Sequence, residues 1–203
     1  MDSFEKFIVE NEAADTVRLV MARREWPVPE DPFLAGIDAK TLVVNTIEAR
    51  RKLRKKLPEW VACTGLVYPS SLCAEQCSSS DTARYKAAIV KRIFNEYVGS
   101  AASAGSATEN KMVTEPVEVT GGIRKTGRIA DLTGGLGVDS WAFGEVAAEV
   151  LYNEMNPELA AAARHNFKAL GATNIFIKNS EATADSVEAV SYTHLTLPTN
   201  REV

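Results

Sequence analysis

The chain has 203 residues, of which 45% are hydrophobic and 25% charged, and its formal net charge is -4 at neutral pH. This composition is that of one globular domain or two small ones, and it excludes an intrinsically disordered chain. No apolar run reaches the roughly 18 residues that a membrane span needs. The N-terminus "MDSFEKFIVENE" is acidic rather than a basic leader, and a negative chain has no global attraction to nucleic acid or anionic lipid. We therefore expect a cytoplasmic protein with no membrane partner.

The cysteine spacing gives no support for a metal site or a disulfide framework. The three residues Cys63, Cys73 and Cys77 are odd in number, and their spacing matches neither pattern. We expect free thiols, buried or half-buried, and no bound metal.

The first half of the chain has the periodicity of helices. Apolar side chains recur at helical spacing over residues 4–24, which predicts two short helices. After a proline-rich break, residues 38–60 read as one long helix that ends at Pro58. A further helix is predicted to begin near Ser80 and Asp81. These elements define a helical N-terminal domain over residues 1–98.

A change in composition separates this region from the rest. Residues 99–111 are small and polar, as in a flexible linker. Residues 112–127 alternate apolar and polar positions around Gly121 and Gly122, which favours a short hairpin. We therefore assign residues 99–126 to a linker or insertion.

From residue 128 the hydrophobic pattern alternates between strand and helix. It predicts strands at 128–132, 149–155 and 174–179, and helices at 139–147 and 156–171, the second stopped by Gly171. Strands that alternate with helices in this way form a parallel sheet. The fold class is thus α/β, with a helical N-terminal region followed by the first part of a parallel sheet over residues 127–189.

The stretch "DLTGGLGVDS", residues 131–140, holds three glycines between the first strand and its helix. Such a turn gives a nucleotide access to backbone amides at the start of the helix. Glu154 follows Asp131 by 23 residues, close to the roughly 20-residue interval at which an acid meets ribose hydroxyls. A nicotinamide or flavin fingerprint is incomplete, because Ser140 stands where the third glycine belongs, and no GK[ST] of a P-loop follows.

These motifs resemble class I methyltransferases that use S-adenosylmethionine. The stretch "NEMNPELAAAARHN" is similar to the second-strand acid and following helix of that family, and "NIFIKNSEA" to its third strand. The resemblance covers residues 128–182 and implies a Rossmann-like sheet with S-adenosylmethionine as cofactor. The cofactor-binding residues it implies are Asp131, Thr133, Gly134, Gly135, Gly137, Asp139, Glu154, Met155 and Glu181.

Each of these acids also has a structural interpretation. Asp131 alone would read as a turn or helix cap, and Glu154 alone as a solvated strand end. Their joint spacing favours a cofactor role for both, with Asp131 near the amine and sulfonium of the ligand and Glu154 on the ribose hydroxyls. For Asp139 and Glu181 the two interpretations stay open.

A narrower resemblance comes from the N-terminal half. The stretches "ARRKLRKKLPEW", "VYPSSLCAEQCSSSDTARYKA" and "DLTGGLGVDSWAF" are similar, in this order, to a bacterial group of class I methyltransferases that carry a THUMP-like domain. That group implies RNA as the substrate, by analogy with other THUMP proteins. The resembled family has seven strands, so we expect this chain to be a fragment, and residues 190–203 resemble a translated sequencing adapter.

Three further features allow a structural and a functional interpretation. The run "RRKLRKK", residues 50–56, holds six cations in seven positions and could contact RNA phosphates or form a solvated helix face. Glu75 and Gln76 precede a turn that is either a plain helix cap or a cofactor contact. His165 is expected at the surface rather than as a catalytic base.

Two functions of different classes follow. The first is the N-terminal fragment of an RNA-directed methyltransferase, for which the catalytic residues are unknown because the family places its acceptor motif after a fourth strand. We expect this fragment to be inactive on its own. The second is a nucleotide-binding or helical adaptor module without chemistry.

Overall fold

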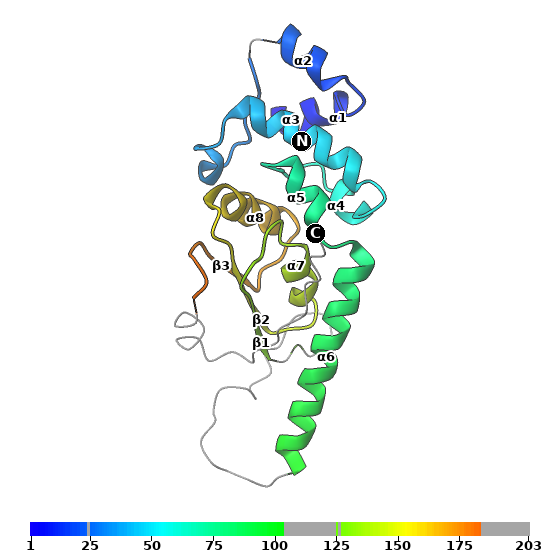
Figure 1. The fold of residues 1–203 in the computed structure, drawn as a ribbon, viewed down its shortest axis with the longest axis vertical. Helices are drawn as coiled ribbons and strands as arrows, with labels where there is room; N and C mark the ends of the chain where they lie inside the picture. The colour runs from blue at the N-terminus through cyan, green and yellow to red at the C-terminus, as the bar shows by residue number, and fades with distance from the viewer. Residues whose placement is uncertain (24, 104–124, 126, 184–203) are drawn as a thin grey trace.

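The computed structural model describes residues 1–23, 25–103, 125 and 127–183. The described part is elongated, with the first helices at one end and one long helix running beside the sheet toward the other (Figure 1). The predicted helical half is confirmed. Its elements are α1 (Ser3–Glu10), α2 (Thr16–Ala22), the 3-10 helix η1 (Pro32–Leu34), α3 (Ala39–Leu53), α4 (Pro58–Ala62), α5 (Ser71–Gln76) and α6 (Ser80–Ser103).

Short polar side chains begin most of these helices. Asp2, Asp15 and Asp38 each accept a backbone N–H from the first turn of α1, α2 and α3, and Ser70 does the same for α5. Such caps satisfy amide groups that have no partner within the helix. The helix boundaries are therefore set locally by the sequence.

Two boundaries differ from the prediction. The long helix expected over residues 38–60 is divided, because α3 ends at Leu53 and Pro58 begins α4 instead of ending a helix. Proline suits a first helical position, where its missing N–H has no partner to lose. Helix α6 continues to Ser103, five residues into the predicted linker, in an alanine-containing stretch that favours helix. The expected hairpin around Gly121 and Gly122, and residues 190–203, lie outside the described residues.

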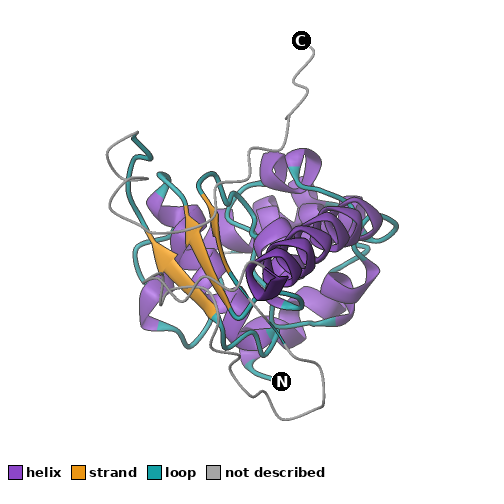
Figure 2. Ribbon diagram, turned by 90° about the horizontal axis from the view of Figure 1, so that it is seen from below, coloured by secondary structure: helices purple, strands orange, loops and turns teal. Residues whose placement is uncertain are grey.

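The second half contains the predicted parallel sheet. Its elements are β1 (Arg128–Asp131), α7 (Val138–Gly144), β2 (Glu149–Asn153), α8 (Pro157–Ala169) and β3 (Ile175–Lys178). The strands lie in the order β1-β2-β3, all parallel (Figure 2). Gly171 follows α8 with φ of 69°, as the predicted stop requires. The carboxyl ends of β1 and β2 therefore meet at one edge.

The two faces of this sheet differ in burial. Ile129, Val150 and Tyr152 are buried, and they pack in clusters with apolar residues of α7 and α8. Side chains alternate between the faces of a strand, so the opposite face carries a paired apolar row. Ala130 pairs with Leu151, and Leu151 with Phe176, whose side chain is 53% exposed.

The helical half and the sheet share buried contacts. One apolar cluster contains residues from α3 to α6 together with residues of β1, α7 and β2, and Trp60 meets Trp141 edge to face at 6.1 Å. Asn166 of α8 is fully buried, and its side-chain amide donates to Val67 O and accepts from Val67 N, both at 2.9 Å. These contacts hold the first half against α7 and α8.

Candidate cofactor site

The carboxyl ends of β1 and β2 bring the glycine turn and Glu154 together. Glu154 Oε2 accepts the backbone N–H of Gly135 at 2.9 Å, and Oε1 accepts that of Asn156 at 2.9 Å. Asp131 lies at the end of the neighbouring strand. In open α/β sheets this edge is where ligands bind, which makes it the candidate site.

The glycines of the turn serve a different purpose from the one expected. A Cβ on Gly134 would lie 2.2 Å from Cε2 of Tyr152, and one on Gly137 would lie 2.6 Å from Cζ of Phe167. Packing within the chain, rather than room for a ligand, therefore requires these two glycines. A Cβ on Gly135 would meet no atom closer than 3.9 Å, but its φ of +53° is a left-handed conformation that favours glycine.

Tyr152 and Phe167 form the platform under this turn. Their rings meet edge to face at 5.5 Å, and the Tyr152 hydroxyl donates to Gly135 O at 2.6 Å. The Gly134 amide also donates to Asn153 O at 2.8 Å. The turn is thus held from below by β2 and α8, which leaves its outer side to a ligand.

Asp131 is half-buried at the end of β1. Ser140 Oγ donates to it at 2.6 Å, and the Thr133 amide donates at 3.3 Å. Burial raises the pKa of Asp131, and the nearby negative charge of Asp139 raises it further, while the Ser140 hydrogen bond opposes both. A carboxylate in this environment gains from a positively charged group placed beside it.

Asp139 pairs with Lys86 of the long helix α6. Its Oδ2 lies 2.6 Å from Lys86 Nζ and accepts from Ser78 Oγ at 3.0 Å. Sequence reasoning missed Lys86 and Ser78, which lie 53 and 61 residues before Asp139. No local pattern marks a partner at such separations.

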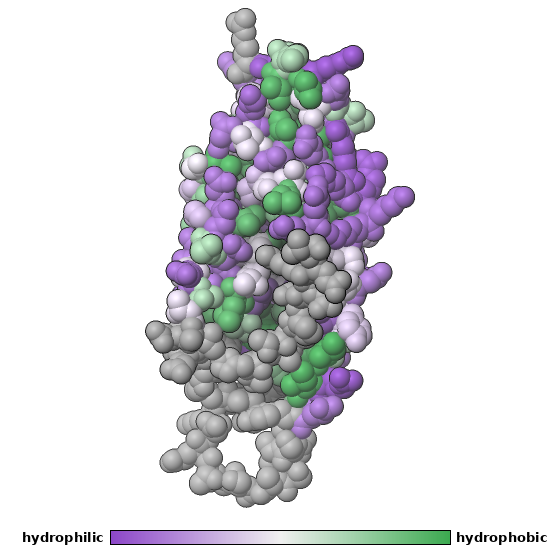
Figure 3. Space-filling view, in the orientation of Figure 1, coloured by the Kyte–Doolittle hydropathy of each residue, from purple (hydrophilic) through white to green (hydrophobic). Residues whose placement is uncertain are grey.

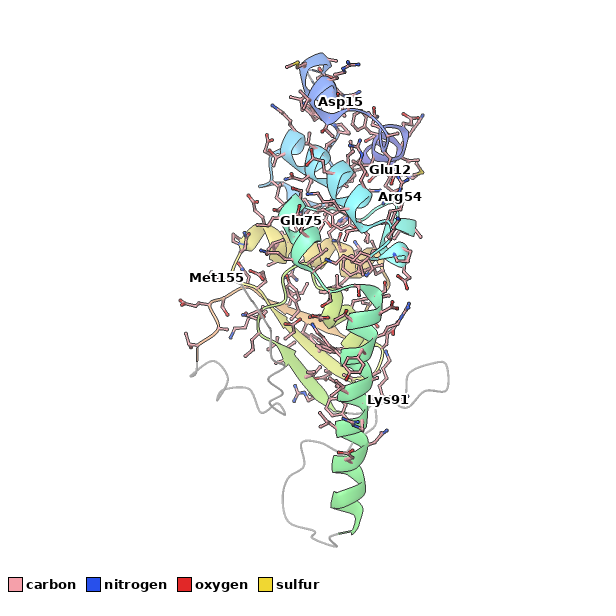
Figure 4. The ribbon with its side chains drawn as sticks, turned by 45° about the vertical axis from the view of Figure 1, so that its right-hand side comes forward. Glu12, Asp15, Arg54, Glu75, Lys91 and Met155 are labelled. Carbon is pink, nitrogen blue, oxygen red and sulfur yellow. The ribbon has the colours of Figure 1, made fainter. Side chains whose placement is uncertain are left out.

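The remaining predicted residues lie at the exposed rim. Thr133 and Glu181 are exposed, and Met155 is 68% exposed at the outer edge of the molecule in Figure 4. Sequence reasoning also missed Asn153, whose side-chain amide donates to Leu132 O at 3.2 Å and to Ser180 O at 3.0 Å. Asn153, at the end of β2, thereby joins the segments that follow β1 and β3. Its place at the end of a predicted strand is the one sequence signal that could have pointed to it.

The basic run at residues 50–56 is occupied by contacts within the chain. Arg50 is buried, donates to Val61 O and Cys63 O, and lies 3.6 Å from Glu12. Arg51 donates to the Glu12 and Ala14 carbonyl oxygens. The expectation of a solvated helix face is therefore wrong for these two side chains, because backbone carbonyls of neighbouring segments take up their N–H groups.

The other cations of the run are engaged at its edge. Arg54 pairs with Glu12, and Lys52 with Glu75, all labelled in Figure 4 except Lys52. Lys56 donates to the Ala74 and Glu75 carbonyl oxygens. Glu75 thus meets the basic run rather than the glycine turn. This edge belongs to the hydrophilic surface beside α3 and α4 (Figure 3).

His165 is a structural contact and not a free surface residue. Its Nδ1 lies 2.7 Å from Asp31 Oδ2 and its Nε2 lies 2.9 Å from Gly65 O. His165 thereby joins α8 to the start of η1 and to Gly65.

The cysteines are free thiols, as predicted. Burial raises the pKa of Cys73 to about 11 and also raises that of Cys77, which keeps both protonated at neutral pH. Within the described ranges, no three His, Cys, Asp or Glu side chains are grouped so as to hold a metal ion. No helix in those ranges is long and apolar enough to cross a bilayer.

No protein-family model and no curated protein matches the sequence. Among solved structures, the chain is similar to the crystal structure of a candidate methyltransferase from Porphyromonas gingivalis W83, with a TM-score of 0.58 and 24% sequence identity. The likeness covers 91% of this chain and 36% of that protein's chain. It shows a shared fold.

Proposed function

We propose that this chain binds S-adenosylmethionine and forms the cofactor-binding part of a methyltransferase that acts on RNA. The observation that carries the proposal is the contact of Glu154 with Gly135, which joins the glycine turn to an acid at the ends of adjacent parallel strands. The fold shared with a candidate methyltransferase supports it. The resemblance of residues 128–182 to class I methyltransferases supplies the cofactor.

The two acids suit the two ends of this cofactor. Each Glu154 oxygen accepts one backbone N–H, and a carboxylate oxygen has two lone-pair sites, so Glu154 retains acceptor capacity for the two ribose hydroxyls. Asp131 is half-buried and close to another negative charge. A sulfonium and an ammonium group would offset that cost.

The chemistry of methyl transfer needs little from side chains beyond placement. It is an in-line displacement in which the enzyme orients the acceptor against the sulfonium methyl group. The resembled family positions the acceptor with residues that follow a fourth strand, and the described residues contain three strands. We therefore assign cofactor residues and no catalytic ones.

The proposal of RNA as acceptor rests on the THUMP-like group that the N-terminal half resembles. We further propose that the chain is part of a longer protein, which its 36% coverage of the Porphyromonas gingivalis protein supports. Sequencing the source gene through and beyond this region tests that point directly.

Calorimetry tests cofactor binding. The chain is expected to bind S-adenosylhomocysteine and not NAD. Glu154→Ala should weaken binding through the loss of two charge-assisted hydrogen bonds, each about 1.5 to 3 kcal/mol at most. Glu158→Ala is the matched control, because this acid lies exposed in the first turn of α8. Binding of NAD without any response to S-adenosylhomocysteine would overturn the assignment.

The acceptor is tested by transfer of a labelled methyl group. The product of the uninterrupted gene is incubated with radioactive S-adenosylmethionine and total RNA, and the label should enter RNA. Label that enters protein instead would retain the methyltransferase and contradict the RNA assignment.

A further inference from the structure

A charged cluster joins the long helix α6 to the start of α7. Lys86 Nζ donates to Asp139 Oδ2 at 2.6 Å and to Ser78 Oγ at 3.0 Å, and the Ser78 hydroxyl donates to the same Asp139 oxygen at 3.0 Å. The Lys86 and Asp139 side chains are 24% and 27% exposed. The cluster is therefore half-buried.

This cluster adjoins the Asp131 carboxylate. Ser140, next to Asp139 in the chain, donates to Asp131 Oδ2 at 2.6 Å. The charges of Asp139 and Lys86 both act on the pKa of Asp131, in opposite directions, after burial as the main cause. Two acids and one base thus share the carboxyl end of β1, the base contributed by the helical half.

Both signs of charge in this cluster retain unused hydrogen-bonding capacity. An ammonium group has three N–H donors, and two of those on Lys86 are used by Asp139 and Ser78. Asp139 Oδ1 is shielded from solvent and accepts no hydrogen bond from the described residues. A buried acceptor without a partner costs about 1 to 3 kcal/mol, which an ion pair made only to join two helices does not explain.

We propose that Lys86 binds the carboxylate of the cofactor's amino-acid end, while Asp131 and Asp139 bind its ammonium group. An amino acid carries both charges on one carbon, and the cluster offers a cation and two anions side by side. The inference rests on the proposed function, because it assumes that the ligand is S-adenosylmethionine or its product. It makes Lys86 the residue by which the site distinguishes the intact cofactor from a shortened thioether.

Calorimetry with paired ligands tests the proposal on the 203-residue chain. S-adenosylhomocysteine carries the amino-acid end, and 5′-methylthioadenosine is the same kind of nucleoside thioether without it. Lys86→Met should lower the affinity for S-adenosylhomocysteine at least tenfold and leave that for methylthioadenosine unchanged. Lys91→Met, on the same helix at an exposed position (Figure 4), should change neither affinity.

A ligand lacking only the carboxylate tests the same contact without a variant. Decarboxylated S-adenosylhomocysteine should bind the wild-type chain at least tenfold more weakly than the intact compound. Equal affinity would overturn the proposal even if Lys86→Met does not fold.

The remaining outcomes separate the two proposals. An equal loss of both ligands in Lys86→Met would make Lys86 structural, and tighter binding would mean that it fills the ammonium position in the free protein. Either result overturns the inference and leaves the proposed function in place. A wild-type chain that binds none of these ligands would overturn the proposed function, and this inference with it.

Discussion

The basic run of α3 and the carboxyl edge of the sheet are both rich in charge, but their charged groups have different partners. Arg50 and Arg51 donate to backbone carbonyls of α4, of Cys63 and of the segment after α1, although Arg50 Nε and Glu12 Oε1 have no hydrogen-bond partner among the described residues. At the sheet edge, Glu154 retains free acceptor positions and Asp139 Oδ1 has no hydrogen-bond donor among the described residues. Charges satisfied within the chain serve folding, whereas those with spare capacity are the ones to test for binding.

The largest expected effect is on stability, in the basic run. Arg50→Met keeps the apolar stem but leaves the Val61 and Cys63 carbonyl oxygens without their donor, and Glu12 with Arg54 as its remaining cation. The variant loses two hydrogen bonds from a charged donor, each worth about 1.5 to 3 kcal/mol, and this loss should appear in urea unfolding. Lys55→Met, at an exposed position of the same run, should stay within about 0.5 kcal/mol of wild type. Similar stabilities of the two variants would show that the contacts of Arg50 contribute no more to folding than an exposed lysine does.

A smaller effect is expected where the two regions meet, at Asp31 and His165. Burial alone would raise the pKa of Asp31, but the His165 hydrogen bond, the Phe33 amide and the nearby positive charges outweigh it and lower the pKa below 3.8. The stability from this carboxylate is therefore present above its ordinary pKa and lost as the pH falls through the lowered native value. Asp31→Asn should cost about 1.5 to 3 kcal/mol at neutral pH.

The pH dependence gives this prediction its control. In urea unfolding from about pH 6 to about pH 3, wild type should lose more stability than Asp31→Asn, because only the wild type has this carboxylate to protonate. Parallel curves for the two proteins would show that the contact with His165 contributes nothing.

The glycine turn should respond in both stability and binding. Gly134→Ala places a methyl group 2.2 Å from the Tyr152 ring, and overpacking of this kind costs about 1 to 3 kcal/mol. The affinity for S-adenosylhomocysteine should fall as well, because Gly135 would move relative to Glu154. Gly36→Ala is the control, since its added methyl group meets nothing within 4 Å. A stable Gly134→Ala with unchanged affinity would show that the turn tolerates movement.

The smallest effect concerns RNA. Lys55 is the exposed cation of the run for which no contact within the chain is described, so Lys55→Met should reduce the salt slope of RNA binding by about 1 at most. Neutralising Arg51 and Lys56 should instead lower the unfolding temperature, because both hold backbone carbonyls. A drop near that limit would show that Lys55 contacts an RNA phosphate, and an unchanged slope would show that it does not.

Local patterns predicted the elements and the place of the candidate site. The alternation of strand and helix after residue 128, and the stop at Gly171, depend on neighbours within a few residues. Glu154 was predicted because its distance from Asp131 along the chain reflects one crossover of the sheet, and the structure brings it to the glycine turn.

Long-range partners could not be predicted in the same way. Arg50 meets carbonyls of α4, and Lys86 meets Asp139 across 53 residues, and nothing in either local sequence marks the partner. The requirement for Gly134 and Gly137 likewise comes from Tyr152 and Phe167, which only the folded chain brings beneath them. A glycine cluster in a sequence indicates close contacts with the backbone, but not whether a ligand or a side chain makes them.

The contact of Asn166 with Val67 gives a single proton that reports on the whole arrangement. The Val67 amide donates to a side chain of α8 and lies in an irregular segment, so no strand or helix of its own slows its exchange with deuterium. Its protection lasts only while α8 stays docked. The hydrogen-exchange rate of this amide, measured by NMR, therefore reports how often the two halves separate, and the measurement needs neither a ligand nor a variant.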